Sequence, residues 1–306
     1  MAEAIEARVA GPLYGSRERA CWPDPLVAAY KQLMQRLFAP HLGWLAAVVL
    51  LSACVGVNQQ TPPAPLQPTA LITGASRGIG FELARQYAAK GWGVIATCRT
   101  PAGASDLQAL AAANPNVIIE ELDVTDFYEM ERLAVRYEGV PIDVLINNAG
   151  ILGGNDRQKF GTFDYKAFDE VMAVNVKGPI RMVELFINNV AMSEQKKIMN
   201  ISSSVGSVKL AFPGQNFYKA SKSALNMSMK ILSKELRGAN QRGRKEIIIG
   251  LIHPGVVRTD FAGPVPIPMI EPEESAAGVI NVIETYYTGR RQSGDFMSYT
   301  GSKLPW

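Results

Sequence analysis

Histidine and cysteine are scarce in this chain of 306 residues, which contains two histidines and three cysteines. The cysteines (Cys21, Cys54 and Cys98) lie far apart and show no paired metal-ligand spacing. We therefore expect neither a disulfide framework nor a zinc site, and two histidines are too few for a multi-histidine metal centre. Long basic runs are also missing, and a net charge of +3 is too small to indicate nucleic-acid binding.

Hydrophobic residues make up 47% of the chain and charged residues 19%, so the protein can bury a sizeable core. The length suits one large α/β domain or two ordinary ones. This composition indicates a globular, intracellular protein, but the N-terminal region departs from it.

Charge is absent from residues 42–57, which form one apolar run. The run is shorter than the ~20 residues of a membrane-spanning helix but long enough for the core of a signal peptide. Arg36 precedes it, and Leu51-Ser52-Ala53-Cys54 resembles a bacterial lipoprotein box, in which the cysteine is lipidated after cleavage. A buried or dimerising helix is the alternative interpretation.

The N-terminal region is accordingly divided into three parts. The four prolines and the glutamines of its last part indicate an extended linker. The predicted parts are a poorly ordered extension at 1–33, a signal or anchor segment that associates with a membrane at 34–57, and a Pro/Gln-rich linker at 58–68.

A glycine-rich turn follows the linker. The apolar strand Thr69–Thr73 runs into Gly74-Ala-Ser-Arg-Gly-Ile-Gly80, and a helical pattern then extends to Lys90. Strand, glycine turn and helix form the context of a dinucleotide site, because glycine lets the backbone approach a pyrophosphate at the helix N-terminus. The spacing Gly74, Gly78, Gly80 differs from the G-x-G-x-x-G fingerprint.

An acidic residue is missing at the end of the next strand, residues 94–98, where one would bind the ribose hydroxyls of NAD. Arg99 stands there instead, and Arg77 lies in the glycine turn. Two guanidinium groups suit a 2′-phosphate, so the sequence favours NADP(H) over NAD(H). The alternative is that both are ordinary surface arginines.

Strands and helices alternate along the rest of the chain. This alternation predicts a single doubly wound Rossmann domain over 69–306, α/β in class, with a mainly parallel seven-stranded sheet and helices on both faces. Asp126 is expected to cap a helix. Further strands are expected at 117–122, 142–146, 197–201 and 247–252, and helices at 126–137, 164–190 and 218–237.

Tyr218 and Lys222 are four residues apart and therefore share one face of a helix. A free tyrosine titrates near pH ~10, and a neighbouring cation favours its phenolate, so the pair is a candidate proton donor. A chance pair on a solvated helix face is the alternative. Asn175 lies inside a predicted helix, where asparagine is unfavourable, and this invites a functional reason.

These motifs together resemble the short-chain dehydrogenase/reductase family, over residues 69–306. They stand in the family's order, and the stretches 218–227 and 293–306 are similar to C-factor/sniffer-type carbonyl reductases. The matching motifs are Thr73-Gly-x-x-x-Gly-x-Gly80, Asn147-Asn-Ala-Gly150, Asn175, Ser202-Ser203-Ser204, Tyr218-x-x-x-Lys222 and Pro254-Gly255.

The resemblance implies a role for each matching residue. Tyr218 would be the general acid/base, with Lys222 lowering its pKa and holding the nicotinamide ribose. Asn175 would position a water, and Ser203 would bind substrate, while Ser202 and Ser204 would be structural. The interval from Ser203 to Tyr218 is about two residues longer than is usual in the family, so the loop 205–216 is expected to bulge at the pocket.

The implied cofactor is NADP(H), and no metal is implied. The residues that the resemblance assigns to cofactor binding are Gly74, Ser76, Arg77, Gly78, Ile79, Gly80, Arg99, Asp123, Val124, Asn148, Ala149, Gly150, Tyr218, Lys222, Val257 and Thr259.

The predicted reaction moves a hydride between nicotinamide and a small carbonyl or alcohol substrate. The segment 261–270 is interpreted as a lid over an apolar pocket, with Ile151 and Leu152 in its wall, or else as a Pro-rich surface loop. Two other classes of function stay open, a cofactor-binding signalling protein similar to C-factor and a membrane-tethered protein that uses the fold structurally. Assembly into a homo-oligomer is also left open.

The predicted compartment contains a conflict. Arg36 precedes the apolar run and no cation follows until Arg77, which places the main domain outside the cytoplasm. Nicotinamide cofactors, by contrast, are supplied in the cytoplasm. Membrane association through 34–57 is the expectation, and the side of the membrane stays open.

Overall fold

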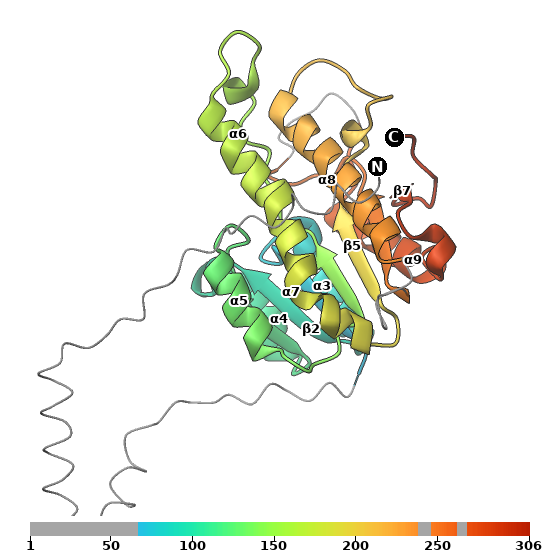
Figure 1. Ribbon diagram of the computed structural model, residues 1–306. Helices are drawn as coiled ribbons and strands as arrows, with labels where there is room; N and C mark the ends of the chain where they lie inside the picture. Colours follow the sequence, from blue (N-terminus) through green and yellow to red (C-terminus); the bar gives the residue numbers. More distant parts are fainter. Residues whose placement is uncertain (1–66, 238–245, 262–267) are drawn as a thin grey trace, which may run out of the picture. The chain divides into compact units, whose positions relative to one another are not determined.

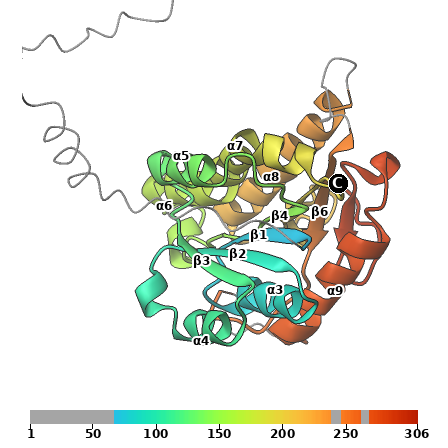
Figure 2. The same cartoon turned by 90° about the horizontal axis from the view of Figure 1, so that it is seen from below.

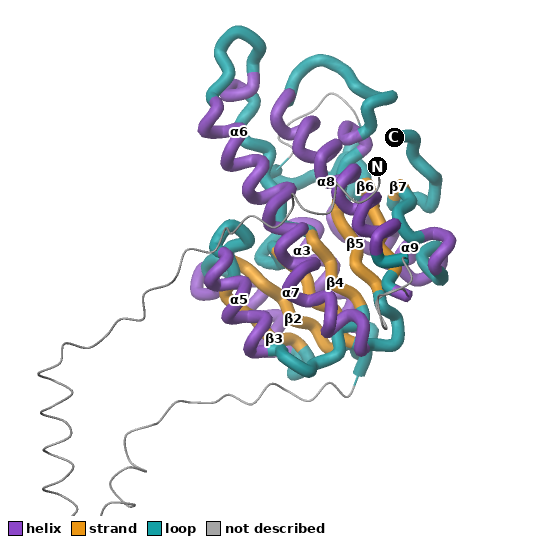
Figure 3. Tube along the Cα trace, in the orientation of Figure 1, coloured by secondary structure: helices purple, strands orange, loops and turns teal. Residues whose placement is uncertain are grey.

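The strands form one seven-stranded sheet in the order β3-β2-β1-β4-β5-β6-β7, and every pairing in it is parallel. The computed structural model describes residues 67–237, 246–261 and 268–306. In Figure 3 the strands are orange, with α7 lying across them. The strands are β1 (Thr69–Thr73), β2 (Gly93–Cys98), β3 (Val117–Glu121), β4 (Val144–Asn147), β5 (Lys197–Ile201), β6 (Ile248–His253) and β7 (Phe296–Ser298).

Helices cover both faces of this sheet. One face packs against α3, α4 and α9 and the other against α5, α7 and α8, so that the sheet is the middle of three layers (Figure 2). The helices are α3 (Gly78–Ala89), α4 (Ser105–Ala113), α5 (Phe127–Arg136), α6 (Tyr165–Met172), α7 (Gly178–Met192), α8 (Asn216–Glu235) and α9 (Pro272–Thr285).

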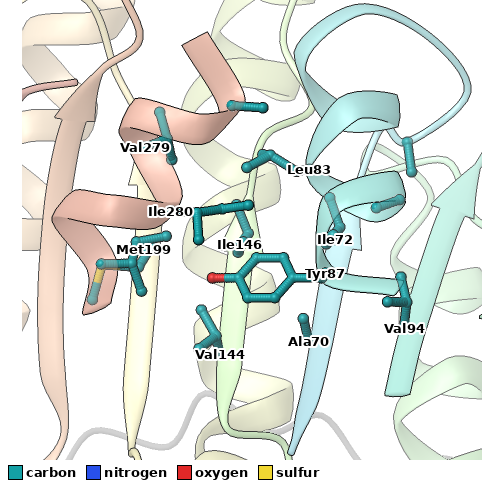
Figure 4. Close-up of a cluster of buried hydrophobic side chains, with 14 of the residues drawn as sticks. Ala70, Ile72, Leu83, Tyr87, Val94, Val144, Ile146, Met199, Val279 and Ile280 are labelled. Carbon is teal, nitrogen blue, oxygen red and sulfur yellow. The ribbon is translucent and has the colours of Figure 1, made fainter. Parts of the chain in front are cut away.

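The strands are mostly apolar because both faces of the sheet are covered. All five residues of β1 are buried, for example. Figure 4 shows the core between the sheet and the helices α3 and α9, with the Tyr87 ring among aliphatic side chains and its hydroxyl pointing toward Met199 and Ile280. Among the described residues, that buried hydroxyl has no hydrogen-bond partner.

The predicted fold class and the parallel seven-stranded sheet are confirmed, and the expected elements lie within a few residues of their predicted bounds. Asp126 caps α5 as expected, since its side chain accepts hydrogen bonds from the N–H groups of Tyr128 and Glu129. The seventh strand, β7, is only three residues long. It is too short to show a periodicity, and the sequence did not locate it.

The helix expected at 164–190 is confirmed with one change. Asp164 caps α6, and α6 and α7 form one continuous helical run (Figure 1), but the turn between them, Ala173–Lys177, is a π-helix. Asn175 lies in the middle of this wide turn.

The expectations for 1–33 and 34–57, including the lipidation of Cys54, lie outside the described residues, as do most of the linker and 262–267 of the predicted lid. They stay predictions. No helix in the described ranges is long and apolar enough to cross a membrane.

Candidate active site at the carboxyl edge of the sheet

The glycine turn between β1 and α3 packs so closely against its neighbours that a side chain would not fit at two of its glycines. A Cβ at Gly80 would lie 2.2 Å from the Gly74 carbonyl oxygen and 2.4 Å from the Asn148 side-chain nitrogen. A Cβ at Gly74, whose φ is +69°, would lie 2.9 Å from the Ala149 Cα. The turn therefore presents bare backbone at the start of α3, which fits a pyrophosphate. Ser76 and Ile79 are half-buried in the same turn.

The end of β4 fixes this turn in place. The side-chain nitrogen of Asn148 donates to the carbonyls of Thr73 (2.9 Å) and Gly74 (3.1 Å). The backbone N–H groups of Asn148 and Ala149 both donate to the Thr73 hydroxyl. Asn148 thus holds the turn, and this use of its side chain is structural.

The two arginines expected at the 2′-phosphate follow neighbouring strands, Arg77 in the turn after β1 and Arg99 directly after β2. Arg77 is the N-cap residue of α3, and Arg99 follows β2 directly and is exposed. The register pairs Thr73 with Thr97, so the ends of β1 and β2 adjoin. A guanidinium nitrogen of Arg77 lies 3.6 Å from a carboxylate oxygen of Asp260, and both side chains are largely exposed. The exposed side chain of Arg77 is therefore accessible to an anion.

Asp123 and Val124 follow β3. The Asp123 carboxylate accepts hydrogen bonds from the N–H and the hydroxyl of Thr125, at 2.8 and 2.7 Å. Val124 is buried beneath the start of α7, where a Cβ at Gly178 would lie 2.9 Å from the Val124 carbonyl oxygen. The resemblance assigns both residues to cofactor binding, and in the structure they follow β3 on the same sheet edge as the glycine turn.

Asn175 is completely buried and makes three hydrogen bonds. Its side-chain nitrogen donates to the Ile151 carbonyl (2.9 Å) and the Ser221 hydroxyl (3.0 Å), while its side-chain oxygen accepts from the Ile151 N–H (2.9 Å). Both N–H donors of the amide are used, so only its oxygen can accept a further hydrogen bond, for example from water. The π-helical turn Ala173–Lys177, here called the π-turn, therefore places Asn175 between the loop after β4 and helix α8, which carries Tyr218.

Lys222 and Asn175 meet beside Gly150. A Cβ at Gly150 would lie 3.3 Å from the Asn175 side-chain oxygen and 3.7 Å from the Lys222 ammonium nitrogen. Lys222 donates to the Ile201 carbonyl at 2.8 Å, and its nitrogen is 5.8 Å from the centre of the Tyr218 ring. Residues from β4, β5, the π-turn and α8 thus converge at one place.

The electrostatics of the Tyr218–Lys222 pair differ from the sequence expectation. Burial raises the pKa of Tyr218 to about 12, and a hydrogen bond with Ser203 acts in the opposite direction. Burial also lowers the pKa of Lys222 to about 8, because the ammonium is nearly inaccessible to water and faces a carbonyl instead of a carboxylate. Desolvation is the largest cause of both shifts.

The serine run separates into different environments. Ser202 is buried and donates to the Asn226 side chain at 2.6 Å, which is a structural contact. Ser203 is the partner of Tyr218, and its oxygen also faces the Val205 N–H at 3.4 Å. Of the loop that follows, Val208, Leu210 and Phe212 are exposed.

The loop after β6 returns to the glycine turn. The Thr259 methyl carbon lies 3.2 Å from where a Cβ at Gly78 would stand, and Val257 is bridged to Ile270. The Phe261 ring meets the Tyr218 ring edge-to-face, with centroids 5.6 Å apart. Ile151 packs against the cluster around Phe217. The Phe261 ring therefore gives Tyr218 one apolar neighbour.

Sequence reasoning missed three residues at this site. Ser221 bonds to Asn175, Asp260 pairs with Arg77, and Gln158 accepts a hydrogen bond from the Tyr218 N–H. Ser221 lies inside the Tyr218–Lys222 motif and could have been found there. Gln158 ends a short 3₁₀ turn and Asp260 stands in a loop, and neither residue carries a spacing signal.

The sequence of this chain is similar to those of known proteins. Residues 68–267 match the sequence model of a family described as short chain dehydrogenase. The C-signal protein of Myxococcus xanthus is 31% identical over 170 residues, which cover 54% of this chain and 93% of that protein.

Two solved structures are also similar. The NADPH-bound carbonyl reductase from chicken fatty liver is 31% identical with a TM-score of 0.71, over 78% of this chain and 99% of that one. The carbonyl reductase Sniffer of D. melanogaster is 27% identical with a TM-score of 0.68, over 78% and 100%.

Proposed function

Because the chain belongs to the short-chain dehydrogenase/reductase family, we propose that it is an NADP(H)-dependent oxidoreductase acting on a carbonyl or alcohol substrate. The observation that carries the proposal is the convergence of Tyr218, Ser203, Lys222 and Asn175 beside the glycine turn. A protein that only bound a nucleotide would have no need of a buried proton donor at that place.

The chain's own residues fit the cofactor. The bare backbone at Gly74 and Gly80 and the N-terminus of α3 would hold the pyrophosphate, and Arg77 and Arg99 would hold a 2′-phosphate. The chicken liver structure contains NADPH, which supports the phosphorylated cofactor. When bound, NADPH supplies the hydride.

Tyr218 would protonate the substrate oxygen during reduction. A pKa raised to about 12 keeps the phenol protonated at neutral pH, which is the form that a proton donor requires. Negative charge develops on the carbonyl oxygen as the hydride arrives, so hydroxyl donors from Ser203 and Tyr218 stabilise the transition state. Lys222 would hold the nicotinamide ribose, and the Asn175 oxygen would position a water for proton resupply.

The substrate side of the site favours a hydrophobic carbonyl compound. Phe261 stacks edge-to-face on Tyr218, and Ile151 lies in the apolar cluster with Phe217. Apolar walls with two hydroxyl donors are typical of pockets that orient a carbonyl group and bind the rest of the molecule by burial.

The test is oxidation of NADPH, and separately of NADH, by the full chain with a panel of aldehydes, ketones and quinones. We expect turnover with at least one apolar carbonyl compound and a preference for NADPH. Tight NADPH binding without turnover on any member of the panel would contradict the proposal.

The similarity to C-signal supports a second candidate, a cofactor-binding signalling protein with little turnover. The two candidates differ in what the buried groups do. For a signalling protein, loss of the Tyr218 hydroxyl would leave the biological activity intact, whereas an enzyme would lose it.

A further inference from the structure

Helix α8, which carries Tyr218 in its first turn, begins without the local side-chain cap that α5 and α6 have. The first N–H groups of a helix lack partners within the helix and need acceptors from elsewhere. Asp126 and Asp164 supply these acceptors for α5 and α6. At α8 the N-cap residue is Gln215, which lies in the left-handed region (φ 53°) and makes no side-chain capping hydrogen bond.

Gln158 supplies the acceptor from a distant part of the chain. Its side-chain oxygen accepts a hydrogen bond of 2.9 Å from the Tyr218 N–H. Its side-chain nitrogen donates to the carbonyls of Leu152 (2.7 Å) and Gly154 (3.0 Å). Only 2% of Gln158 is exposed. The three bonds fix the orientation of the amide, because a flipped group would set its nitrogen against the N–H and its oxygen against two carbonyls.

The short turn that carries Gln158 is itself held firmly. Gln158 ends the 3₁₀ turn Asp156–Gln158. Arg157, next to it, forms ion pairs with Asp164 at 2.7 Å and Glu170 at 2.8 Å. These contacts tie the turn to helix α6, which lies beside the upper part of α8 in Figure 1.

The segment 151–158, here called the strap, therefore links two candidate catalytic positions. Asn175 binds both the N–H and the carbonyl of Ile151 at one end, and Gln158 binds the N–H of Tyr218 at the other. The strap also contributes Ile151 to the apolar cluster around Phe217. The start of α8 and the surroundings of Asn175 therefore depend on hydrogen bonds from the same segment.

We propose that Gln158 is a positioning residue for Tyr218, capping the catalytic helix from the strap and thereby setting the phenol against the substrate oxygen. This inference rests on the proposed function. Without the cap, the first turn of α8 loses an acceptor and gains freedom to move. A displacement of about 1 Å at a reacting group can cost up to about 100-fold in rate.

The decisive variant is Gln158→Met, which keeps the length of the side chain and removes all three hydrogen bonds. We expect kcat to fall at least about tenfold, with the KM for NADPH within about twofold, since the glycine turn is untouched. Gln158→Glu should be protonated at this buried position, because its second oxygen faces two carbonyls, and it then keeps the acceptor for the Tyr218 N–H and one of the two donors. It should therefore retain more activity than Gln158→Met, and it serves as the second variant where Gln158→Met fails to fold.

Asn189 provides a matched control. It is another buried amide that bridges two carbonyls, those of Tyr137 (2.6 Å) and Val140 (2.8 Å), and it lies near the end of α7, away from the candidate site. Asn189→Leu should lower the melting temperature without changing kcat. An equal fall of kcat in both variants would assign the effect to general destabilisation and overturn the inference.

Amide hydrogen exchange on the full chain separates this inference from the proposed function. We expect the peptide that begins α8 to exchange at least about tenfold faster in Gln158→Met and at the parental rate in Asn189→Leu. Unchanged exchange there, or unchanged kcat in folded Gln158→Met, overturns the positioning role. Absence of turnover in the parent chain, with faster exchange in Gln158→Met, would overturn the proposed function and leave the cap standing.

Discussion

The two halves of the sheet edge form their parts of the candidate site in opposite ways. Around β1 the site consists of backbone, and its central feature is the lack of side chains at Gly74 and Gly80. Around β5 and α8 it consists of buried polar side chains, of which Asn175 is fully enclosed and Lys222 is 4% exposed. The first half depends on glycines whose missing side chains allow close packing, and the second half depends on hydrogen bonds. Substitutions in the two halves should therefore have different effects.

The largest effect is expected in the second half, from Tyr218→Phe. Removing the proton donor should lower kcat by about 100- to 10,000-fold, the range typical of a general acid, while NADPH binding changes little. Steady-state kinetics and cofactor titration together measure this. Tyr165→Phe, which alters an exposed tyrosine on α6, is the control. Activity within tenfold of the parent on every substrate would show that Tyr218 is not the donor.

In the first half, Gly80→Ala tests whether NADPH binding requires the absence of a side chain at this position. The added methyl would stand 2.2 Å from the Gly74 carbonyl oxygen, so the turn must shift. Overpacking of this kind costs about 1–3 kcal/mol, and we expect NADPH binding to weaken by about tenfold or more. Gly103→Ala is the control, because its Cβ would meet only a methyl group at 3.8 Å. Equal binding by both variants would contradict the steric account.

A smaller effect is expected from a variant that tests which arginine in the first half discriminates NADPH from NADH. Arg99→Ala should reduce the ratio of NADPH to NADH efficiency by about tenfold, because an exposed charge-assisted hydrogen bond to phosphate is worth about 1.5 kcal/mol. Arg132→Ala on α5 is the control, since this side chain contacts the Tyr128 ring. A ratio that stays constant would leave Arg77 as the group that reads the phosphate.

The smallest effect concerns the core beneath both halves. Tyr87→Phe removes a buried hydroxyl that has no partner among the described residues, so the free energy of unfolding should stay level or rise by up to about 1 kcal/mol. Tyr137→Phe removes a hydroxyl that donates to Glu120 at 2.7 Å and should destabilise the protein by about 1–3 kcal/mol. Urea unfolding measures both, and a reversed order would refute this interpretation.

The difference between the halves also explains what the sequence can predict. The glycine turn and its strand and helix are contiguous in the chain, so residues 69–90 sufficed to place them. Tyr218 and Lys222 share one helix, and their spacing was visible for the same reason. Gln158 and Asp260 act through contacts between separate loops, which no local pattern records.

The electrostatics of the site were beyond the sequence for a related reason. A spacing of four residues shows that Tyr218 and Lys222 share a face, but it does not show how far that face is buried. Burial is decided by the loops and helices packed around it, and it determines the pKa of both groups.

The π-turn Ala173–Lys177 has a consequence for the alignment of two helices. In an α-helix the side chains of successive residues point about 100° apart around the helix axis. The wide turn holds an extra residue and so rotates α7 relative to α6. One uninterrupted rod can thereby direct Ala167 and Val171 into the cluster beside the strap and Met182 and Phe186 into the core under the sheet. The extra residue thus sets the rotation of α7 about the helix axis relative to α6. Deletion of a single residue within the turn would point one of these two apolar faces toward water.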